Sequence, residues 1–180
     1  LTTINNQKIM ENMKKITNLN DLFIQQLREL YNAENLALKT FPQLKNKASS
    51  TELKNAIQDH MDETEQHVRR LEKIFDELDS NPTGEKSTAM QGLINEGLDV
   101  IERCADPEVR DAALIATIQY IEHFEIAGYV SACTYADELG LQDIADQLYL
   151  TMTEEKETDE KLSDIAMEQI NEKAKVPVLA

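Results

Sequence analysis

The stretch TELKNAIQDHMDETEQHVRRLEKIF, residues 51–75, predicts a helix whose core-facing side is interrupted by polar residues. With about 100° of rotation per residue and His60 set at zero, most of the apolar side chains fall within roughly 60° of zero; they are Leu53, Ala56, Ile57, Leu71, Ile74, Phe75 and Leu78. His60, Glu63 and His67 fall in the same sector, whereas Asp62 and Glu65 fall on the opposite, solvent-facing side. A buried charge is costly unless it is paired, protonated or bound to a metal ion. The inward polar groups therefore indicate a buried site.

Turn signals on either side of this helix divide the rest of the chain into further helices. Asn18 or Asn20 is expected to cap the helix before it, and Ser49 is expected to cap the helix itself. Asp106 and Pro107 form an N-cap and first-position pair that starts a later helix. The predicted helices cover residues 20–46, 50–79, 88–104, 107–139 and 141–173.

This order of helices predicts an all-α fold, a ferritin-like four-helix bundle. Its two antiparallel helical hairpins would be joined by a long crossover that carries a short fifth helix. Residues 20–173 are expected to form the bundle domain, residues 1–19 an N-terminal arm and residues 174–180 a C-terminal tail. The low numbers of glycine and proline, five and four, favour an all-helical chain.

Each of the other three long helices also points at least one carboxylate toward the core. Glu34 lies on the apolar face of the first helix. Glu125 lies on the apolar face of the helix 107–139, with Glu122 at the edge of that face. Glu155 and Asp159 share the apolar face of the last helix. We therefore expect all four long helices to contribute to the buried site.

Four carboxylates are expected at one height in the bundle. Glu34 and Glu63 each lie about 14 residues from the turn between their helices, and Glu125 and Glu155 each lie about 15 residues from theirs. In antiparallel hairpins, residues at equal distances from the turn lie at equal heights. The four carboxylates should therefore meet near the midpoint of every helix.

A weak internal repeat, with an offset of 91 to 92 residues, supports this arrangement. LYNAENLAL around Glu34 resembles IEHFEIAGY around Glu125, and DETEQH resembles EEKETD. In the second pair of stretches, His67 corresponds to Asp159. Each half of the chain would thus supply one carboxylate from its first helix and two ligands at i and i+4 from its second.

Crowded carboxylates repel one another, and a multivalent hard cation is the simplest counter-charge. His67, one turn beyond Glu63, is a further candidate ligand. His60 is either a ligand or a residue that supports one, and Glu122 is either an extra ligand or a hydrogen-bonding partner. Imidazole among carboxylates suits iron or manganese and, less well, zinc.

The composition excludes several other kinds of function. The net charge of −16, from 34 acidic and 18 basic side chains, is expected to repel nucleic acid and anionic lipid. No apolar run reaches the length that spans a bilayer, so no membrane partner is expected. Cys104 and Cys133 have no disulfide-framework spacing and are expected to be reduced thiols in a cytoplasmic protein.

The sequence resembles the YciE/YciF family of ferritin-like bacterial stress proteins from about residue 18 to residue 172. The resemblance is carried by LFIQQLRELYNAE, SSTELKNAIQDHMDETEQHVRRLEKIF, AMQGLINEG, DAALIATIQYIEHFEIAGY and TMTEEKETDEKL. It implies a four-helix bundle, a homodimer and a dinuclear metal centre related to those of rubrerythrin and ferritin. It also implies a role in general or osmotic stress.

One departure from the ferritin-like di-iron pattern concerns the second ligand on two of the helices. Those proteins carry Glu-x-x-His on both helices, but the i+3 positions here are occupied by Gln66 and Thr158. The candidate ligands His67 and Asp159 lie at i+4 instead. A site with so many oxygen ligands selects its divalent metal less strictly.

We therefore expect a cytoplasmic, homodimeric stress protein that binds one or two divalent metal ions in the core of its bundle. Iron is the favoured metal, with manganese and zinc as alternatives, and the chemistry expected of an enzyme here is oxidation of Fe(II) or removal of peroxide. The alternative is a structural or interaction protein in which protonation, water and the histidines satisfy the carboxylates without a functional metal. The candidate metal ligands are Glu34, Glu63, His67, Glu125, Glu155 and Asp159, with His60 and Glu122 as additional candidates.

Overall fold

The computed structural model describes residues 15–175, and every regular element in this range is a helix. The predicted all-α fold is confirmed. None of the described helices is both long and apolar enough to cross a membrane. Most of the predicted N-terminal arm, and residues 176–180 of the predicted tail, lie outside the described residues. The elements are α2 (Leu19–Lys47), α3 (Thr51–Glu77), α4 (Thr88–Arg103), α5 (Pro107–Glu138), α6 (Gln142–Ile165), the π-helical turn η1 (Ala166–Ile170) and α7 (Asn171–Ala174).

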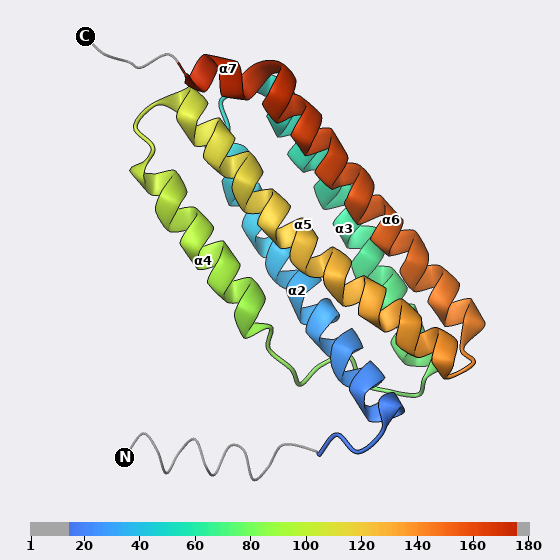
Figure 1. Ribbon diagram of the computed structural model, residues 1–180. Coiled ribbons are helices and arrows are strands. Elements are labelled where there is room, and N and C mark those ends of the chain that lie inside the picture. The colour runs from blue at the N-terminus through green and yellow to red at the C-terminus, as the bar shows by residue number, and fades with distance from the viewer. Residues whose placement is uncertain (1–14, 176–180) are drawn as a thin grey trace, which may run out of the picture.

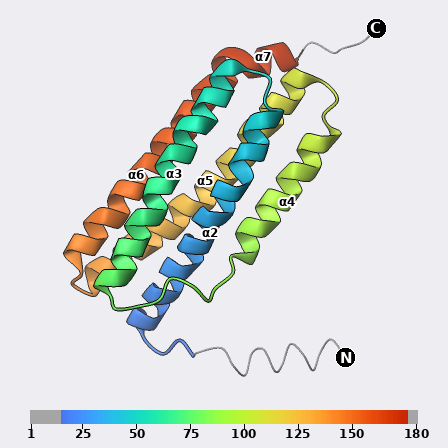
Figure 2. The ribbon, with the colours of Figure 1, turned by 180° about the vertical axis from the view of Figure 1, so that it is seen from behind.

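Four long helices form the bundle, and the shorter α4 lies outside it (Figure 1). The helices contact one another in the cyclic order α2, α3, α6 and α5, with α2–α3 and α5–α6 as the two hairpins. The connection between the hairpins carries α4, which packs against α5 and α2 (Figure 2). This is the ferritin-like arrangement with one long crossover.

Side-chain caps define where the first two long helices begin. The side chain of Asn18 accepts a hydrogen bond from the backbone N–H of Asp21 at 2.9 Å, so it is the cap of α2. The cap of α3 is Ser50, and the prediction of Ser49 was wrong. The reason is the buried carboxylate of Asp111 on α5, which accepts hydrogen bonds at 2.7 Å from the backbone N–H groups of both serines. This carboxylate ties the α2–α3 turn to α5.

Both ends of α5 follow the sequence prediction. Asp106 is its N-cap and Pro107 its first residue. Gly140 follows its C-terminal end with a φ of +73°, a left-handed conformation that glycine adopts at little cost. Along its length, α5 lies so close to α4 that a Cβ atom at Gly97 would be 2.1 Å from Cγ2 of Thr117. A larger residue at this position would therefore separate α4 from the bundle.

The apolar core consists of two clusters that occupy opposite ends of the bundle. The first joins the C-terminal half of α2 to the start of α3 and includes Phe41, Leu53, Ile118 and Leu162. The second joins the N-terminal half of α2 to the end of α3 and includes Phe23, Leu71, Ala132 and Leu148. At the middle of every long helix, between these clusters, the buried side chains are polar.

Candidate metal centre

Six ionisable side chains meet between the two apolar clusters, and none of them has more than 2% of its surface exposed. One glutamate comes from α2, two histidines from α3, two glutamates from α5 and one from α6. All six are candidate ligands predicted from the sequence. They are Glu34, His60, His67, Glu122, Glu125 and Glu155.

One group of three donors forms around His67. Nδ1 of His67 lies 2.9 Å from Oε1 of Glu155 and 3.5 Å from Oε1 of Glu34. The hydroxyl of Tyr129 donates a hydrogen bond to the same oxygen of Glu34, which fixes the orientation of that carboxylate. One donor atom from each of the three residues lies within 4.8 Å of the other two, a spacing that suits ligands of a single metal ion. We call these three residues the His67 group.

A second group, the His60 group, consists of His60, Glu122 and Glu155. Nε2 of His60 lies 2.9 Å from Oε1 of Glu122 and 3.9 Å from Oε2 of Glu155. The donor atoms of these three residues also lie within 4.8 Å of one another. Glu155 thus belongs to both groups and turns one oxygen toward each histidine. A carboxylate shared by two ligand sets fits a dinuclear centre.

Nine buried side-chain atoms of this cluster have no hydrogen-bond partner among the described residues. The close contacts between histidine and glutamate have ion-pair distances but not the geometry of a hydrogen bond. Buried polar groups in folded proteins are nearly always hydrogen-bonded, so a set of unpaired atoms in one place fits a metal ion that would satisfy them together. Among residues 15–175, the unpaired buried side-chain atoms are Oε2 of Glu34, Nε2 of His60, Nδ1 of His67 and both carboxylate oxygens of Glu122, Glu125 and Glu155.

The electrostatics of the cluster also favour a cation. Burial raises the pKa of Glu125 well above its usual value, and the charges of Glu34, Glu155 and Glu122 raise it further. Burial likewise raises the pKa of Glu122, against the opposing effect of His60. Burial alone would lower the pKa of both histidines, but the surrounding carboxylates raise it above the usual value. The metal-free cluster therefore holds protons that a divalent cation would displace.

The outward-facing nitrogen of His67, Nε2, contacts the ion pair between Glu154 and Arg70. Nε2 of His67 lies 3.1 Å from Oε2 of Glu154, and this oxygen also accepts a hydrogen bond from Nη1 of Arg70 at 2.8 Å. Arg70 donates a further hydrogen bond to the hydroxyl of Thr151. The hydrogen bond from His67 lowers the pKa of Glu154, which keeps this carboxylate ionised. A proton on Nε2, directed to Glu154, would leave the lone pair of Nδ1 for a metal ion in the centre.

The outward-facing side of His60 has a neutral partner instead. The hydroxyl oxygen of Thr158 lies 3.3 Å from Nδ1 of His60, and the same hydroxyl donates a hydrogen bond to Oε2 of Glu63 at 3.2 Å. With its own proton directed to Glu63, the hydroxyl oxygen can accept a hydrogen bond from Nδ1–H. Nε2 is then left to face Glu122 and the centre.

Two predicted ligands, Glu63 and Asp159, are not brought into the cluster. Glu63 lies at the rim between α3 and α6, with 43% of its side chain exposed. Asp159 lies between α6 and α5, where Oδ1 accepts a hydrogen bond from Gln119 at 3.0 Å and Oδ2 lies 3.5 Å from Nε2 of the exposed His123. Glu63 occupies the edge of the inward-facing sector of α3, about 60° from His60. Since each residue turns the helix by about 100°, a side chain at this edge reaches a neighbouring helix instead of the centre.

The sequence alone does not single out Glu154, Arg70 and Thr158 as partners of the histidines. Arg70 and Glu154 are 84 residues apart in the chain. Their opposite charges indicate a pair only once the register of α3 against α6 is known, because the sequence does not show that the two positions face each other.

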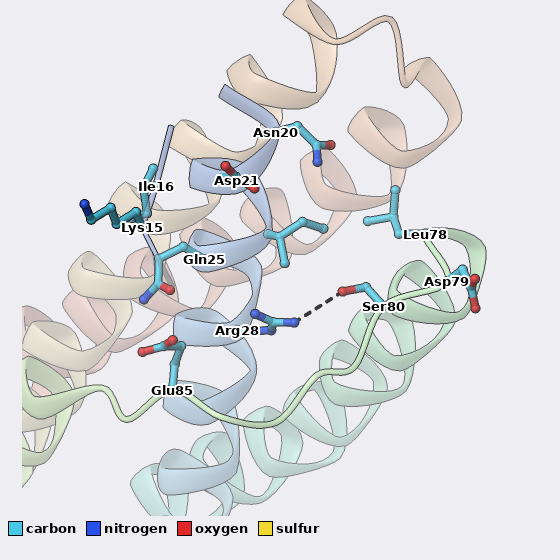
Figure 3. Close-up of a pocket in the computed structure, with 11 residues that line it drawn as sticks. Lys15, Ile16, Asn20, Asp21, Gln25, Arg28, Leu78, Asp79, Ser80 and Glu85 are labelled. Atoms are coloured by element: carbon cyan, nitrogen blue, oxygen red, sulfur yellow. Dashed lines mark hydrogen bonds between the residues drawn. The ribbon is translucent and has the colours of Figure 1, made fainter. Parts of the chain in front are cut away.

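A separate hollow of about 300 Å³ lies at the start of α2, and none of its lining residues belongs to the buried cluster. Figure 3 shows that Arg28 points across this hollow toward Ser80. Arg28 also donates a hydrogen bond to the backbone oxygen of Asn81 at 2.9 Å. Residues of both charges line the hollow, including Lys15 and Glu85, so they favour no single ligand chemistry. The buried cluster is therefore the better candidate for a functional site.

Comparisons with known proteins identify the relatives of this chain. Residues 18–175 match the family described as "Domain of unknown function (DUF892)". Protein YciF of Escherichia coli (strain K12) is 41% identical over 165 residues, which cover 91% of this chain and 97% of that protein. The matched region includes all six residues of the buried cluster.

Solved structures share the architecture. The crystal structure of the E. coli stress protein YciF matches with a TM-score of 0.83 at 38% identity, over 87% of this chain and 99% of that chain. YcfI from Rhodopseudomonas palustris, described as a candidate structural protein, matches with a TM-score of 0.81 at 35% identity, over 83% and 96%. A two-domain protein from Anabaena variabilis with DJ-1-like and ferritin-like domains matches with a TM-score of 0.58 at 16% identity, over 91% and 40%. This last similarity supports the ferritin-like fold alone.

Proposed function

The chain belongs to the DUF892 family and is similar to the stress protein YciF, and from that premise we propose that it is a stress-response protein with a dinuclear metal centre. The observation that carries the proposal is that, within residues 15–175, every buried side-chain atom without a hydrogen-bond partner belongs to one cluster. Such atoms are rare in folded proteins. Their concentration at one level of a ferritin-like bundle is best explained by a ligand set for divalent cations.

The two histidine groups would each hold one metal ion. Glu155 would be shared between the ions, because it belongs to both groups. Glu125, whose carboxylate oxygens are both unpaired, would complete the set. Carboxylates together with imidazoles favour iron, with manganese and zinc as alternatives.

The protein's own contribution is to orient the donors and to keep water out. Glu154 and Thr158 hold the two imidazoles by their outward-facing nitrogens. Burial and the charge of Glu34 raise the pKa of Tyr129 well above its usual value, so its hydroxyl remains a donor to that carboxylate. The apolar clusters cover the centre toward both ends of the bundle. A bound pair of iron or manganese ions would supply one-electron redox chemistry, which suits oxidation of Fe(II) or removal of peroxide.

Metal analysis of protein purified without chelator tests this proposal. We expect about two equivalents of iron or manganese per wild-type chain, and a strong loss of metal in Glu34→Ala and Glu125→Ala. Glu65→Ala is the matched control, because it removes an exposed carboxylate from the opposite face of α3. A wild-type chain that binds no metal, and whose Tm does not rise on addition of Fe(II) or Mn(II), would contradict the proposal.

Redox activity is measured separately from metal binding. Rapid consumption of O₂ or peroxide by the loaded wild type and by Glu65→Ala, but not by Glu125→Ala, would support the proposed chemistry. Full metal loading without consumption would restrict the function to metal binding.

A second candidate function is that of a structural or interaction protein without a functional metal. It is supported by the contacts of 2.9 Å between His60 and Glu122 and between His67 and Glu155, which offset part of the buried charge. The relative YcfI is described as a candidate structural protein. This function predicts that the metal-free chain is fully stable and that added metal leaves its Tm unchanged.

We also infer a homodimer in the cytoplasm. Large apolar side chains are exposed on α5 and α6, including Tyr120 (61%), Tyr149 (62%) and Leu150 (49%), and a second copy could bury them. Both cysteines are free, which agrees with a reducing location. Sedimentation equilibrium should give the mass of two chains for the wild type and a lower mass for Tyr149→Ser with Leu150→Ser.

A further inference from the structure

A cleft between α3 and α6 opens onto the candidate metal centre. Its volume is about 150 Å³. His60, which is only 2% exposed, forms part of its floor. The polar residues that line the cleft are Asp59, His60 and Glu63 from α3, and Glu157, Thr158 and Lys161 from α6.

The contacts at the floor of the cleft lead from solvent to the centre in short steps. Glu63 at the rim is 43% exposed and accepts the hydrogen bond of the Thr158 hydroxyl at 3.2 Å. The oxygen of this hydroxyl lies 3.3 Å from Nδ1 of His60. On the other side of the same ring, Nε2 lies 2.9 Å from Glu122. A single imidazole thus separates the cleft from the unpaired carboxylates of the centre.

The charge of the cleft suits a cation. Asp59 and Glu157 are exposed on its walls. Asp59 is paired with Lys161 across the mouth at 2.7 Å, whereas Glu63 has no lysine or arginine within ion-pair distance in the described part of the chain. An acidic cleft raises the local concentration of cations and their rate of association. Behind the floor, the unpaired buried oxygens offer such cations a binding site. An acidic surface alone would not.

The matching position beside His67 is closed to cations. Glu154 there is already engaged, by His67 at 3.1 Å and by the guanidinium of Arg70 at 2.8 Å. The side chain of Arg70 is only 14% exposed, so its positive charge is fixed between the helices. A fixed positive charge repels an approaching metal ion. Of the two histidines, only His60 therefore offers an approach that favours a cation.

We propose that divalent metal cations reach the centre through this cleft, with Glu63 as the carboxylate that captures them at the rim. The Asp59–Lys161 ion pair bridges the mouth and places there the positive charge of Lys161, which opposes an incoming cation. The inference rests on the proposed metal centre and adds the route by which that centre is loaded. It also gives Glu63 a role that agrees with its position outside the cluster: the side chain binds the incoming cation and does not retain it.

Uptake of Co(II) by the metal-free full chain, followed by visible absorbance in a stopped-flow instrument, tests the route. Glu63→Gln should slow uptake about tenfold at low ionic strength, with the final stoichiometry unchanged. Lys161→Gln should accelerate uptake, because it removes the positive charge at the mouth. Glu65→Gln is the matched control, since it removes an exposed carboxylate from the opposite face of the same helix, and its uptake should equal that of the wild type.

Added salt should slow the wild type toward the rate of Glu63→Gln, because screening weakens the attraction of the cleft. Equal uptake rates for the wild type and Glu63→Gln would overturn the route. A loss of stoichiometry in Glu63→Gln would overturn it as well, because Glu63 would then be a ligand of the centre. Absence of Co(II) binding by the wild type would instead contradict the proposed metal centre itself, so the two failures are distinguishable.

Discussion

The two histidines of the centre both project inward from α3, but their outward-facing nitrogens have opposite surroundings. His67 is backed by the ionised carboxylate of Glu154, which Arg70 holds in place. His60 is backed by the neutral hydroxyl of Thr158 at the floor of an open cleft. A carboxylate behind a metal-binding imidazole fixes its orientation and raises its basicity, and a hydroxyl does so more weakly. Under the proposed function, the His67 side of the centre would hold a metal ion more firmly, and the His60 side would receive one.

Glu155→Ala should have the largest effect, because it removes the residue that both histidine groups share. We expect both metal ions to bind more than about 100-fold more weakly, beyond the range seen for residues that only support a ligand. In the metal-free protein, the free energy of unfolding should fall by about 3–5 kcal/mol, because buried imidazolium groups lose a carboxylate partner. Competition with a chelating dye and urea denaturation measure the two effects. If one ion still bound with wild-type affinity, the groups would not share a ligand.

Glu154→Gln should affect the His67 group alone. The amide keeps the shape of the side chain but removes the charge behind the imidazole, so one of the two ions should bind about 10- to 100-fold more weakly. Titration with Mn(II), followed by electron paramagnetic resonance, resolves the two binding steps. Glu160→Gln, an exposed acid on α6, is the control. Equal weakening of both steps would mean that the two groups are not independent.

The metal-free protein should lose stability as the pH rises above about 6.5. Both imidazoles keep their protons in the folded state after the unfolded chain has released them, since the pKa of each is raised by the surrounding carboxylates. Their stabilising contribution is complete below the unfolded pKa and declines as the pH rises toward the folded one. The raised pKa values of Glu122 and Glu125 act in the same direction. The expected slope is about 1.4 kcal/mol per pH unit for each proton retained.

Glu155 should act in the opposite direction at low pH. Burial would raise the pKa of Glu155, but the neighbouring histidines lower it to about 2. Its contribution is therefore present above about pH 4.5 and is lost as the pH falls toward 2. Urea denaturation across the pH range, with and without Mn(II), measures both the loss of stability at high pH and the loss at low pH. His60→Gln and His67→Gln should each reduce the change in unfolding free energy per pH unit. If the stability of the metal-free protein did not change above neutral pH, the cluster would not hold the protons that we infer.

Thr158→Val should have the smallest effect and should complete the comparison with Glu154→Gln. It removes one neutral hydrogen bond behind His60, which is worth roughly 1 kcal/mol. The second ion should therefore bind no more than about tenfold more weakly, as measured by calorimetry. An effect larger than that of Glu154→Gln would reverse the assignment of the holding and receiving sides.

The helices and the height of the centre follow from local sequence signals. Glu34, Glu125 and Glu155 lie near the middle of the apolar faces of their helices, and all three are buried at the centre. Errors of one or two residues at the helix ends do not alter these faces. For these three carboxylates the apolar spacing of the helix predicts burial correctly, whereas the same spacing places Asp159 on the inward face and the structure leaves it between α5 and α6.

For Glu63, the internal repeat predicted the wrong side chain at the centre. An offset of 92 residues pairs Glu63 with Glu155, whereas the offset of 91 that relates Glu34 to Glu125 pairs Thr64 with Glu155. The structure buries Thr64 and leaves Glu63 at the rim. Because one residue corresponds to about 100° of helix rotation, a single step in the repeat decides which side chain faces the centre.

The partners of the histidines could not be predicted for a different reason. The contacts of His67 with Glu154 and of His60 with Thr158 join α3 to α6, which are distant in the chain. Such contacts depend on the axial register and rotation of packed helices, which ridges and grooves along their whole length determine. No local pattern in α6 carries that information.

The polar layer that divides the apolar core into two clusters also governs how the protein unfolds. Each cluster stabilises one end of the bundle, while the layer between them holds carboxylates that repel one another without a counter-ion. We therefore expect the two ends of the metal-free chain to open as separate local units, which hydrogen exchange would detect. A cation bound to residues from all four long helices would link these units. The metal would then set the distance over which unfolding is cooperative, in addition to any chemistry that it performs.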